Sequence, residues 1–204
     1  MKVAVLADDY QWEELKSSLP ENECFRAMNM EDFISANASI FLYLKDDFSA
    51  LSFSLFTKPI IINSVTATLQ EINAPANVFR INGWQTFLQR PVWEIAGKLN
   101  ESFRVETGLL NKKLIHVPDE VGFPSARVVA MIINEAFFAL QDDVSTKNEI
   151  DIAMKLGTNY PYGPFEWADK IGKQNIYTLL KNLSKTESRY TPSAQLQNEI
   201  QGNI

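Results

Sequence analysis

The sequence has only one cysteine, Cys24, and only one histidine, His116, among its 204 residues. A single cysteine excludes an internal disulfide framework, and together the two scarcities exclude the multi-cysteine and histidine-rich metal sites, so we expect no metal. Apolar runs are short as well. None approaches the roughly 20 apolar residues that cross a bilayer, so we expect no membrane partner. The chain reaches Asp8 and Asp9 too early for a signal peptide, which makes a cytoplasmic location the expectation.

Positive charge is scarce near the start of the chain. The whole sequence carries 25 acidic and 19 basic side chains, a formal net charge of −6. Residues 1–35 alone hold eight acidic and three basic side chains, a net charge of −5. Because a surface of this sign repels phosphate, we expect no nucleic-acid partner.

The first half of the chain alternates short apolar runs with stretches typical of helices. The runs have strand length and are bounded by polar or turn residues; they cover residues 2–7, 24–28, 39–44, 59–63, 78–82, 92–96 and 114–117. Helix-like stretches cover residues 11–17, 48–56 and 100–110. Strands that alternate with helices need crossover connections, so the pattern predicts a largely parallel sheet.

Beyond residue 119 only helical patterns remain, over residues 125–141, 147–156, 165–171, 174–183 and 194–200. Proline and glycine punctuate the change between residues 118 and 122, and this predicts an α/β domain over residues 1–118 and an all-α domain over 119–204. Thr146 and Glu149 form a capping-box pattern, Gly157 marks an expected helix end, and Pro164 suits a first helical position.

The expected helix over residues 125–141 is apolar around most of its circumference. Such a helix is buried in a core or against another subunit, so we expect a homodimer through the helical domain. Glu135 lies within this run, and if it is buried it needs a partner; Arg127 and Lys155 are the candidates.

The segment from Asp151 to Glu166 reads DIAMKLGTNYPYGPFE, and it resembles the C-terminal domain of the 3-hydroxyacyl-CoA dehydrogenases. The similarity extends over roughly the last 85 residues. It implies an all-α domain of the type that also ends 6-phosphogluconate dehydrogenase, following a Rossmann-like parallel-sheet domain that is shortened here. In the family, this helical domain mediates dimer formation and helps to bind acyl-CoA.

The first half resembles the family's NAD-binding domain weakly. A dinucleotide site has a glycine-rich turn after the first strand, where backbone approaches the pyrophosphate. Here that turn contains no glycine and reads Ala7, Asp8, Asp9, Tyr10, Gln11 and Trp12. A like-charge pair at ~4 Å costs about 4 kcal/mol at an effective dielectric of ~20. We therefore expect no NAD or other cofactor at this turn.

The family's catalytic positions are altered too. Asn63 matches the family's asparagine and Glu94 its acid, whereas Val65 replaces the substrate-binding serine and Ala126 the asparagine of the domain junction. Asn82 stands where the family has its catalytic histidine, or Gly83 does if the alignment shifts by one residue. Neither an amide nor a glycine titrates near neutral pH, so we expect these positions to be vestigial.

His116 lies on a different expected strand, and we interpret it as a strand histidine whose ring nitrogens bond locally. Three functions follow as hypotheses. The chain is a catalytically degenerate relative that binds an acyl-CoA-like ligand or a partner such as an intact relative. Alternatively, it is an active NAD-dependent oxidoreductase of fatty acid metabolism acting on 3-hydroxyacyl-CoA. The third hypothesis is a purely structural protein.

Overall fold

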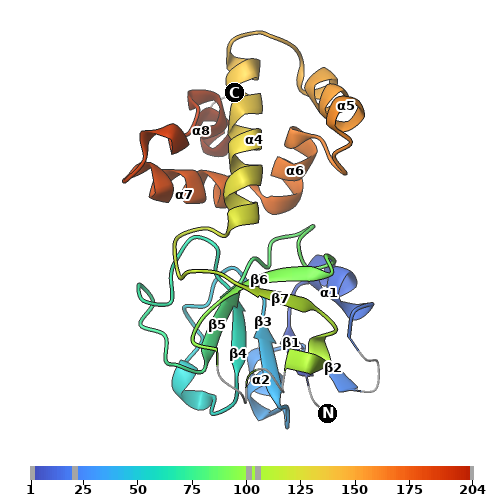
Figure 1. Cartoon of the computed structure of the whole chain (residues 1–204), viewed down its shortest axis with the longest axis vertical. Helices are drawn as coiled ribbons and strands as arrows, with labels where there is room; N and C mark the ends of the chain where they lie inside the picture. The colour runs from blue at the N-terminus through green and yellow to red at the C-terminus, as the bar shows by residue number, and fades with distance from the viewer. Residues whose placement is uncertain (1–2, 20–22, 100–102, 104–106, 203–204) are drawn as a thin grey trace. The chain divides into compact units, whose positions relative to one another are not determined.

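Apolar strands of the first half form one sheet in the computed structural model, which describes residues 3–19, 23–99, 103 and 107–202 (Figure 1). The sheet has seven strands in the order β2-β1-β3-β4-β5-β6-β7. Only the β5–β6 pair is antiparallel. The strands are β1 (Val3–Leu6), β2 (Cys24–Arg26), β3 (Ile40–Tyr43), β4 (Ile60–Asn63), β5 (Val78–Ile81), β6 (Val92–Ala96) and β7 (Lys113–His116). The predicted, largely parallel Rossmann-like sheet is therefore confirmed.

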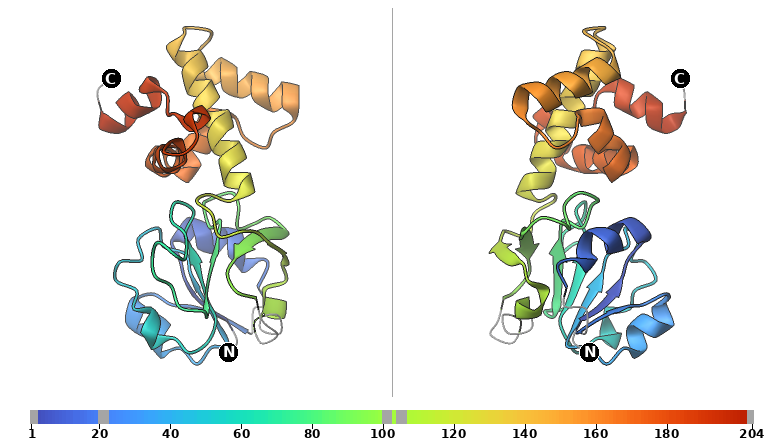
Figure 2. Two further views of the ribbon diagram at one scale, coloured as in Figure 1. Left: turned by 60° about the vertical axis from the view of Figure 1, so that its left-hand side comes forward. Right: turned by 90° about the vertical axis from the view of Figure 1, so that its right-hand side faces the viewer.

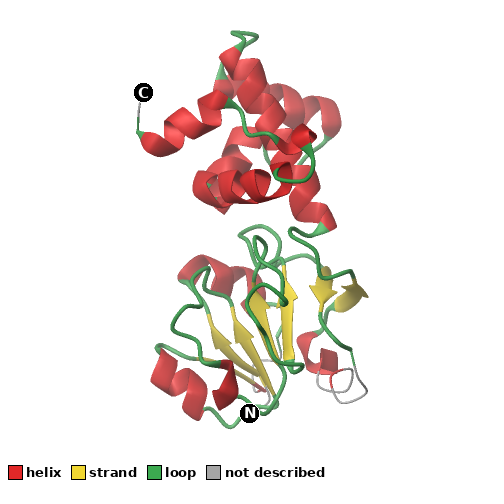
Figure 3. Ribbon diagram, turned by 90° about the vertical axis from the view of Figure 1, so that its left-hand side faces the viewer, coloured by secondary structure: helices red, strands yellow, loops and turns green. Residues whose placement is uncertain are grey.

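Helices cover the sheet on both faces, as in doubly wound α/β proteins (Figures 2 and 3). On one face, α1 (Asp9–Lys16) packs Leu15 into a core cluster with Val3 and Val5. On the other face, α2 (Met30–Ser35) places Phe33 in a second cluster. The sequence patterns did not predict α2. Its first turn is capped by the side chain of Asn29, which accepts a hydrogen bond from a backbone N–H of the helix.

Residues 48–56 were expected to form a helix, and this prediction is wrong. The segment contains only a single 3₁₀ turn, η2 (Phe53–Leu55), and a turn at residues 49–50, and is otherwise irregular. Its apolar side chains instead pack into the core: the centroid of the Phe56 ring lies 5.0 Å from that of Phe41 and 5.6 Å from that of Phe33. The expected helix over residues 100–110 falls largely outside the described residues; its end forms η3 (Gly108–Leu110).

The chain divides into two compact units, Met1–Phe123 and Pro124–Ile204. The division lies a few residues beyond the predicted boundary at 118–122, because the segment after β7 is still bonded to the sheet. Arg80, a fully buried residue of β5, donates to the carboxylate of Asp119 at 2.6 Å and to the backbone oxygens of Ser64 and Glu120. Its guanidinium also stacks 4.6 Å from the ring centroid of Phe123.

Around the long helix α4, the shorter helices of the second unit pack in a bundle (Figure 2). The helices are α4 (Pro124–Gln141), α5 (Lys147–Thr158), α6 (Pro164–Ile171), α7 (Lys173–Ser184) and α8 (Ala194–Gln201), with the 3₁₀ turn η4 (Ser188–Tyr190) before α8. The predicted all-α domain is therefore confirmed. Among the described helices, none is long and apolar enough to cross a membrane.

Local signals in the helical unit are mostly as predicted. Thr146 and Glu149 form the capping box of α5, and Pro164 begins α6. Gly157 does not end α5, because the helix continues to Thr158 and Asn159 takes the left-handed conformation at φ 57°. An asparagine tolerates this conformation through its short polar side chain, so it can replace glycine as a helix stop.

The corner between α5 and α6 is held by a buried carboxylate. Asp151 accepts the backbone N–H groups of Phe165 at 2.8 Å and Glu166 at 3.1 Å, which are donors of the first turn of α6. A Cβ on Gly163 would lie 2.3 Å from the Asp151 carboxyl carbon, so only glycine fits there. Glu166 pairs with Lys155. Glu135 is exposed to solvent, so its carboxylate does not need the charged partner that a buried carboxylate would need.

Candidate functional site

The polar residues predicted as site positions gather where the parallel strands end. The turn after β1 holds Ala7 and Asp8, β4 ends at Asn63, and Asn82 follows β5. Because β1, β3, β4 and β5 are mutually parallel, these residues lie along one edge of the sheet. This is the edge at which open α/β sheets bind ligands.

The first turn of α1 is already bonded to its own carboxylate. Asp8 caps the helix by accepting the backbone N–H of Gln11 at 2.7 Å, while the Gln11 side-chain oxygen accepts the N–H of Asp8 at 3.2 Å. Asp9 forms an ion pair with Arg26 at the end of β2, and the Arg26 guanidinium lies 5.5 Å from the centre of the Trp12 ring. Tyr10 remains exposed.

Next to this turn, two buried amide side chains join the strand ends. The Gln11 Nε2 group donates to the backbone oxygens of Leu44 at 2.6 Å and Gly83 at 3.2 Å. The Asn63 Nδ2 group donates to Asp46 at 2.7 Å, and its Oδ1 accepts the N–H of Gly83 at 3.0 Å. No sequence pattern predicts these bonds, since Gln11 meets residues 33 and 72 positions further along the chain.

Asn82 is buried, and its side-chain oxygen accepts the backbone N–H of Trp84 at 3.3 Å. The antiparallel register pairs Ile81 with Ile95; Asn82 is the first residue after β5, and Glu94 precedes Ile95 in β6. Asn82 stands at the position that resembles the family's histidine, and its amide does not titrate near neutral pH.

The charge of Glu94 acts on a neighbouring guanidinium. Burial lowers the pKa of Arg90, and the negative charge of Glu94 works in the opposite direction. His116 lies on β7, opposite Ile95 in the parallel register, and one of its ring nitrogens is 3.0 Å from the backbone oxygen of Gly97. For this one ring nitrogen the bonding is local, as predicted.

The two remaining vestigial positions are apolar and buried. Val65 is packed below the strand ends, and its backbone oxygen accepts the N–H of Gly122 at 2.8 Å. Ala126 is buried in α4 of the helical unit. A buried methyl or isopropyl group can fill space at these positions but cannot form the hydrogen bonds of the serine and asparagine that the family has there.

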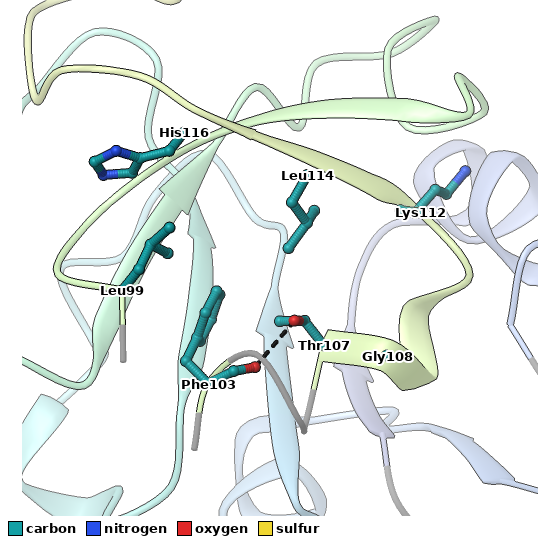
Figure 4. A pocket seen from close by; sticks show the side chains of 7 residues that line it. All are labelled: Leu99, Phe103, Thr107, Gly108, Lys112, Leu114 and His116. Atoms are coloured by element: carbon teal, nitrogen blue, oxygen red, sulfur yellow. Dashed lines mark hydrogen bonds between the residues drawn. The ribbon is translucent and has the colours of Figure 1, made fainter. Parts of the chain in front are cut away.

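A cavity of about 490 Å³ lies beside β7 (Figure 4). It is lined by Leu99, Phe103, Thr107, Gly108, Lys112, Leu114 and His116. Its polar groups are already engaged, because Thr107 donates to the backbone oxygen of Phe103 and Lys112 donates to the backbone oxygens of Leu88 and Arg90. Two of the polar side chains in the described walls are therefore already bonded to backbone oxygens.

The helical unit has an apolar groove between α4 and α5, with a volume of about 420 Å³. Its lining residues are Met131, Ile132, Glu135, Ala136, Ala139, Ile150, Met154 and Pro164, and we call this surface the α4–α5 groove. Large apolar side chains stand exposed elsewhere on the same two helices, with Val128 60% and Leu156 83% exposed.

Metal-binding side chains do not cluster in the described part of the chain, where no group of three such residues was found. The only cysteine of the sequence, Cys24, lies on β2. Cys24 is half-buried on β2, and burial raises the pKa of its thiol to about 11, so it stays protonated at neutral pH.

Comparison with known proteins places the helical unit in a defined class. The model of the 3-hydroxyacyl-CoA dehydrogenase C-terminal domain matches residues 122–201. The 3-hydroxyadipyl-CoA dehydrogenase of Escherichia coli K12 is 47% identical over 87 residues, which are 42% of this chain and 18% of the relative. The 3-hydroxybutyryl-CoA dehydrogenase of Clostridioides difficile is 33% identical over 117 residues, 53% of this chain and 41% of the relative.

The crystal structure of Mycobacterium tuberculosis FadB2 matches at a TM-score of 0.74 over 99% of this chain and 94% of that chain, and at 13% identity this likeness concerns the fold alone. The second unit is thus a 3-hydroxyacyl-CoA dehydrogenase C-terminal domain. It is this domain, residues 122–201, that the comparisons assign to the family, and the chain spans less than half the length of the two curated relatives above.

The family implies a nicotinamide dinucleotide, and the residues at the strand ends do not fit one. The pyrophosphate of such a cofactor needs backbone N–H groups at the start of α1 and a turn without side chains. Here the Asp8 carboxylate already accepts a first-turn N–H, and the Asp9 carboxylate, paired with Arg26, stands beside it. The described residues therefore present carboxylates where the cofactor would need donors.

Proposed function

We propose that this chain is a catalytically degenerate 3-hydroxyacyl-CoA dehydrogenase relative, which works by binding and does not turn over a 3-hydroxyacyl-CoA. The observation that carries the proposal is the amide of Asn82 at the position that resembles the catalytic histidine. Its oxygen accepts the N–H of Trp84. An amide cannot accept a proton from a substrate hydroxyl near neutral pH, so the oxidation has no base at this place.

Neighbouring groups do not supply the missing base. Glu94 keeps the family's acid, but in the family this acid accompanies a histidine. The His116 imidazole lies on another strand, beside the backbone oxygen of Gly97. A positioned general base contributes roughly 10²- to 10⁴-fold to a rate, so its loss alone removes most of the expected activity.

The helical unit supports a binding role. The α4–α5 groove leaves an apolar surface uncovered in the isolated chain, and exposed apolar patches mark interaction sites. We propose that the unit pairs with a second copy of the chain or with an intact relative, and that an acyl-CoA-like ligand binds to the assembled protein. For this protein we propose a cytoplasmic location.

A second candidate is an active NAD-dependent dehydrogenase of 3-hydroxyacyl-CoA in fatty acid metabolism. The observation in its favour is the 47% identity to a 3-hydroxyadipyl-CoA dehydrogenase, together with the retained Asn63 and Glu94. That identity, however, covers 42% of this chain. A purely structural role is the third candidate.

Oxidation of NADH by acetoacetyl-CoA distinguishes the first two candidates, with the Clostridioides difficile 3-hydroxybutyryl-CoA dehydrogenase as positive control. We expect a rate at least about 100-fold below that of the control, because the base is absent. A rate within about tenfold of the control would overturn the proposal. A rise in melting temperature with acyl-CoA supports binding over a structural role, since a ligand of the folded state stabilises it by RT ln(1 + [L]/Kd).

A further inference from the structure

The strand order places a ligand crevice at one point of the sheet. The chain passes from β1 outward to β2 and then back across β1 to β3, so the strand order reverses between β1 and β3. In open α/β sheets, ligands bind outside the carboxyl ends of the strands at this switch point. In this chain the crevice lies between the turn after Leu6 and the segment after Tyr43, which are paired at the ends of β1 and β3.

Gln11 crosses this crevice. From the first turn of α1, its Nε2 group reaches the backbone oxygen of Leu44, the first residue after β3, at 2.6 Å. The same nitrogen is 3.2 Å from the backbone oxygen of Gly83, in the loop after β5. Its oxygen accepts the N–H of Asp8. The side chain is 5% exposed, so these bonds form out of water.

Asn63 continues the connection along the same edge. Its Nδ2 group is 3.4 Å from the backbone oxygen of Leu44 and 2.7 Å from Asp46, and its Oδ1 accepts the N–H of Gly83. The loop can approach this closely only because residue 83 is glycine, since a Cβ there would lie 2.8 Å from the Cβ of Asn63. Both polar backbone atoms of Gly83 are thus bonded to the two amide side chains.

We propose that these two amides, which we call the Gln11–Asn63 bridge, occupy and close the switch-point crevice, so that the α/β unit folds around its own side chains and excludes dinucleotides. This inference rests on the proposed degenerate function and deepens it. It concerns the binding of the cofactor, whereas the missing base concerns the oxidation step. A dinucleotide entering the crevice must break buried hydrogen bonds of Gln11 and meet the carboxylates of Asp8 and Asp46.

The test titrates the wild-type chain with NADH and follows cofactor fluorescence and melting temperature. We expect no saturable signal up to about 1 mM NADH. Saturable binding below that concentration overturns the bridge proposal. If the bound NADH is not oxidised by acetoacetyl-CoA, the proposed lack of turnover survives, so the two proposals fail separately.

Hydrogen exchange tests the bridge without any ligand. Gln11→Met removes the Nε2 donor at nearly constant volume, and Gln70→Met is the matched control in an exposed turn. We expect amide exchange to be at least about tenfold faster in Gln11→Met at Asp8, whose N–H loses its Gln11 acceptor, and at Gly83, whose N–H is held by Asn63 in the same bridge, and unchanged in Gln70→Met. Equal exchange in both variants contradicts the bridge. If Gln11→Met does not fold while Gln70→Met does, the bridge is required for folding, as the proposal states.

Discussion

The buried pair of Arg80 and Asp119 gives a sharp prediction about stability. Arg80 is fully buried, and the Asp119 side chain is 29% exposed, with 2.6 Å between the Arg80 Nε and the Asp119 carboxylate. Asp119→Asn removes the negative charge but keeps the shape, leaving the guanidinium buried without its counter-charge. Two backbone oxygens still accept from Arg80 and soften the loss. We therefore expect a cost of about 2–3 kcal/mol.

Differential scanning calorimetry can measure this cost. For a protein of this size, each 1 kcal/mol shifts the melting temperature by roughly 2–4 °C, so we expect a fall of roughly 5–10 °C in the transition of the α/β unit. Asp9→Asn is the control, because it makes the same change at an ion pair whose carboxylate is 89% exposed. Exposed pairs contribute about 0–1 kcal/mol. Equal shifts in the two variants would refute the reasoning.

Three further predictions follow from particular side chains. Gly163→Ala should destabilise the helical unit by about 1–3 kcal/mol, because the new Cβ would overlap the buried Asp151 carboxylate. At Gly157 a Cβ meets nothing within 4 Å, so Gly157→Ala should stabilise α5 by about 0.5–1 kcal/mol. Urea unfolding of both variants measures these changes, and a similar loss of stability in the two would contradict the packing argument. Burial raises the pKa of Glu199, but the hydrogen bonds and positive charges of Lys147 at 2.5 Å and Lys173 at 2.7 Å have the larger effect and hold this pKa below 4.5. The stabilisation from this shift is present above pH 4.5 and is lost as the pH falls through the lowered pKa of Glu199 in the folded protein. Glu199→Gln should therefore weaken the dependence of stability on pH in acid unfolding followed by circular dichroism. An unchanged acid unfolding profile would be inconsistent with this. Cys24, with a pKa of about 11 against an ordinary 9.0, should react with iodoacetamide at pH 8 about 100-fold more slowly in the folded than in the urea-unfolded chain, and equal rates would show that burial does not protect it.

The fold was largely predictable from the sequence because its signals are local. Apolar runs such as residues 59–63 are bounded by turn residues, and they became the buried strands of the sheet. The errors came from tertiary contacts. Phe56 has helical spacing to its neighbours, yet it completes an aromatic cluster with Phe33 and Phe41. The helix α2 is six residues long and too short for a clear period, although its cap Asn29 is a typical start signal.

The candidate site was predictable only in part. The lack of glycine in the turn after β1 and the amide at Asn82 are visible in the sequence once the family resemblance is recognised. The bonds of Gln11 to Leu44 and Gly83 are not, because they join segments far apart in the chain. No local pattern distinguishes a glutamine that caps a helix from one that closes a crevice.

The most direct test of the account is NADH oxidation by acetoacetyl-CoA with the protein in stoichiometric amount, measured for the wild-type chain and for Asn82→His. Because the crevice is closed as well as lacking a base, we predict that both proteins leave NADH unoxidised on the timescale in which an intact relative completes one turnover. A full turnover of NADH by the wild-type chain would contradict the account.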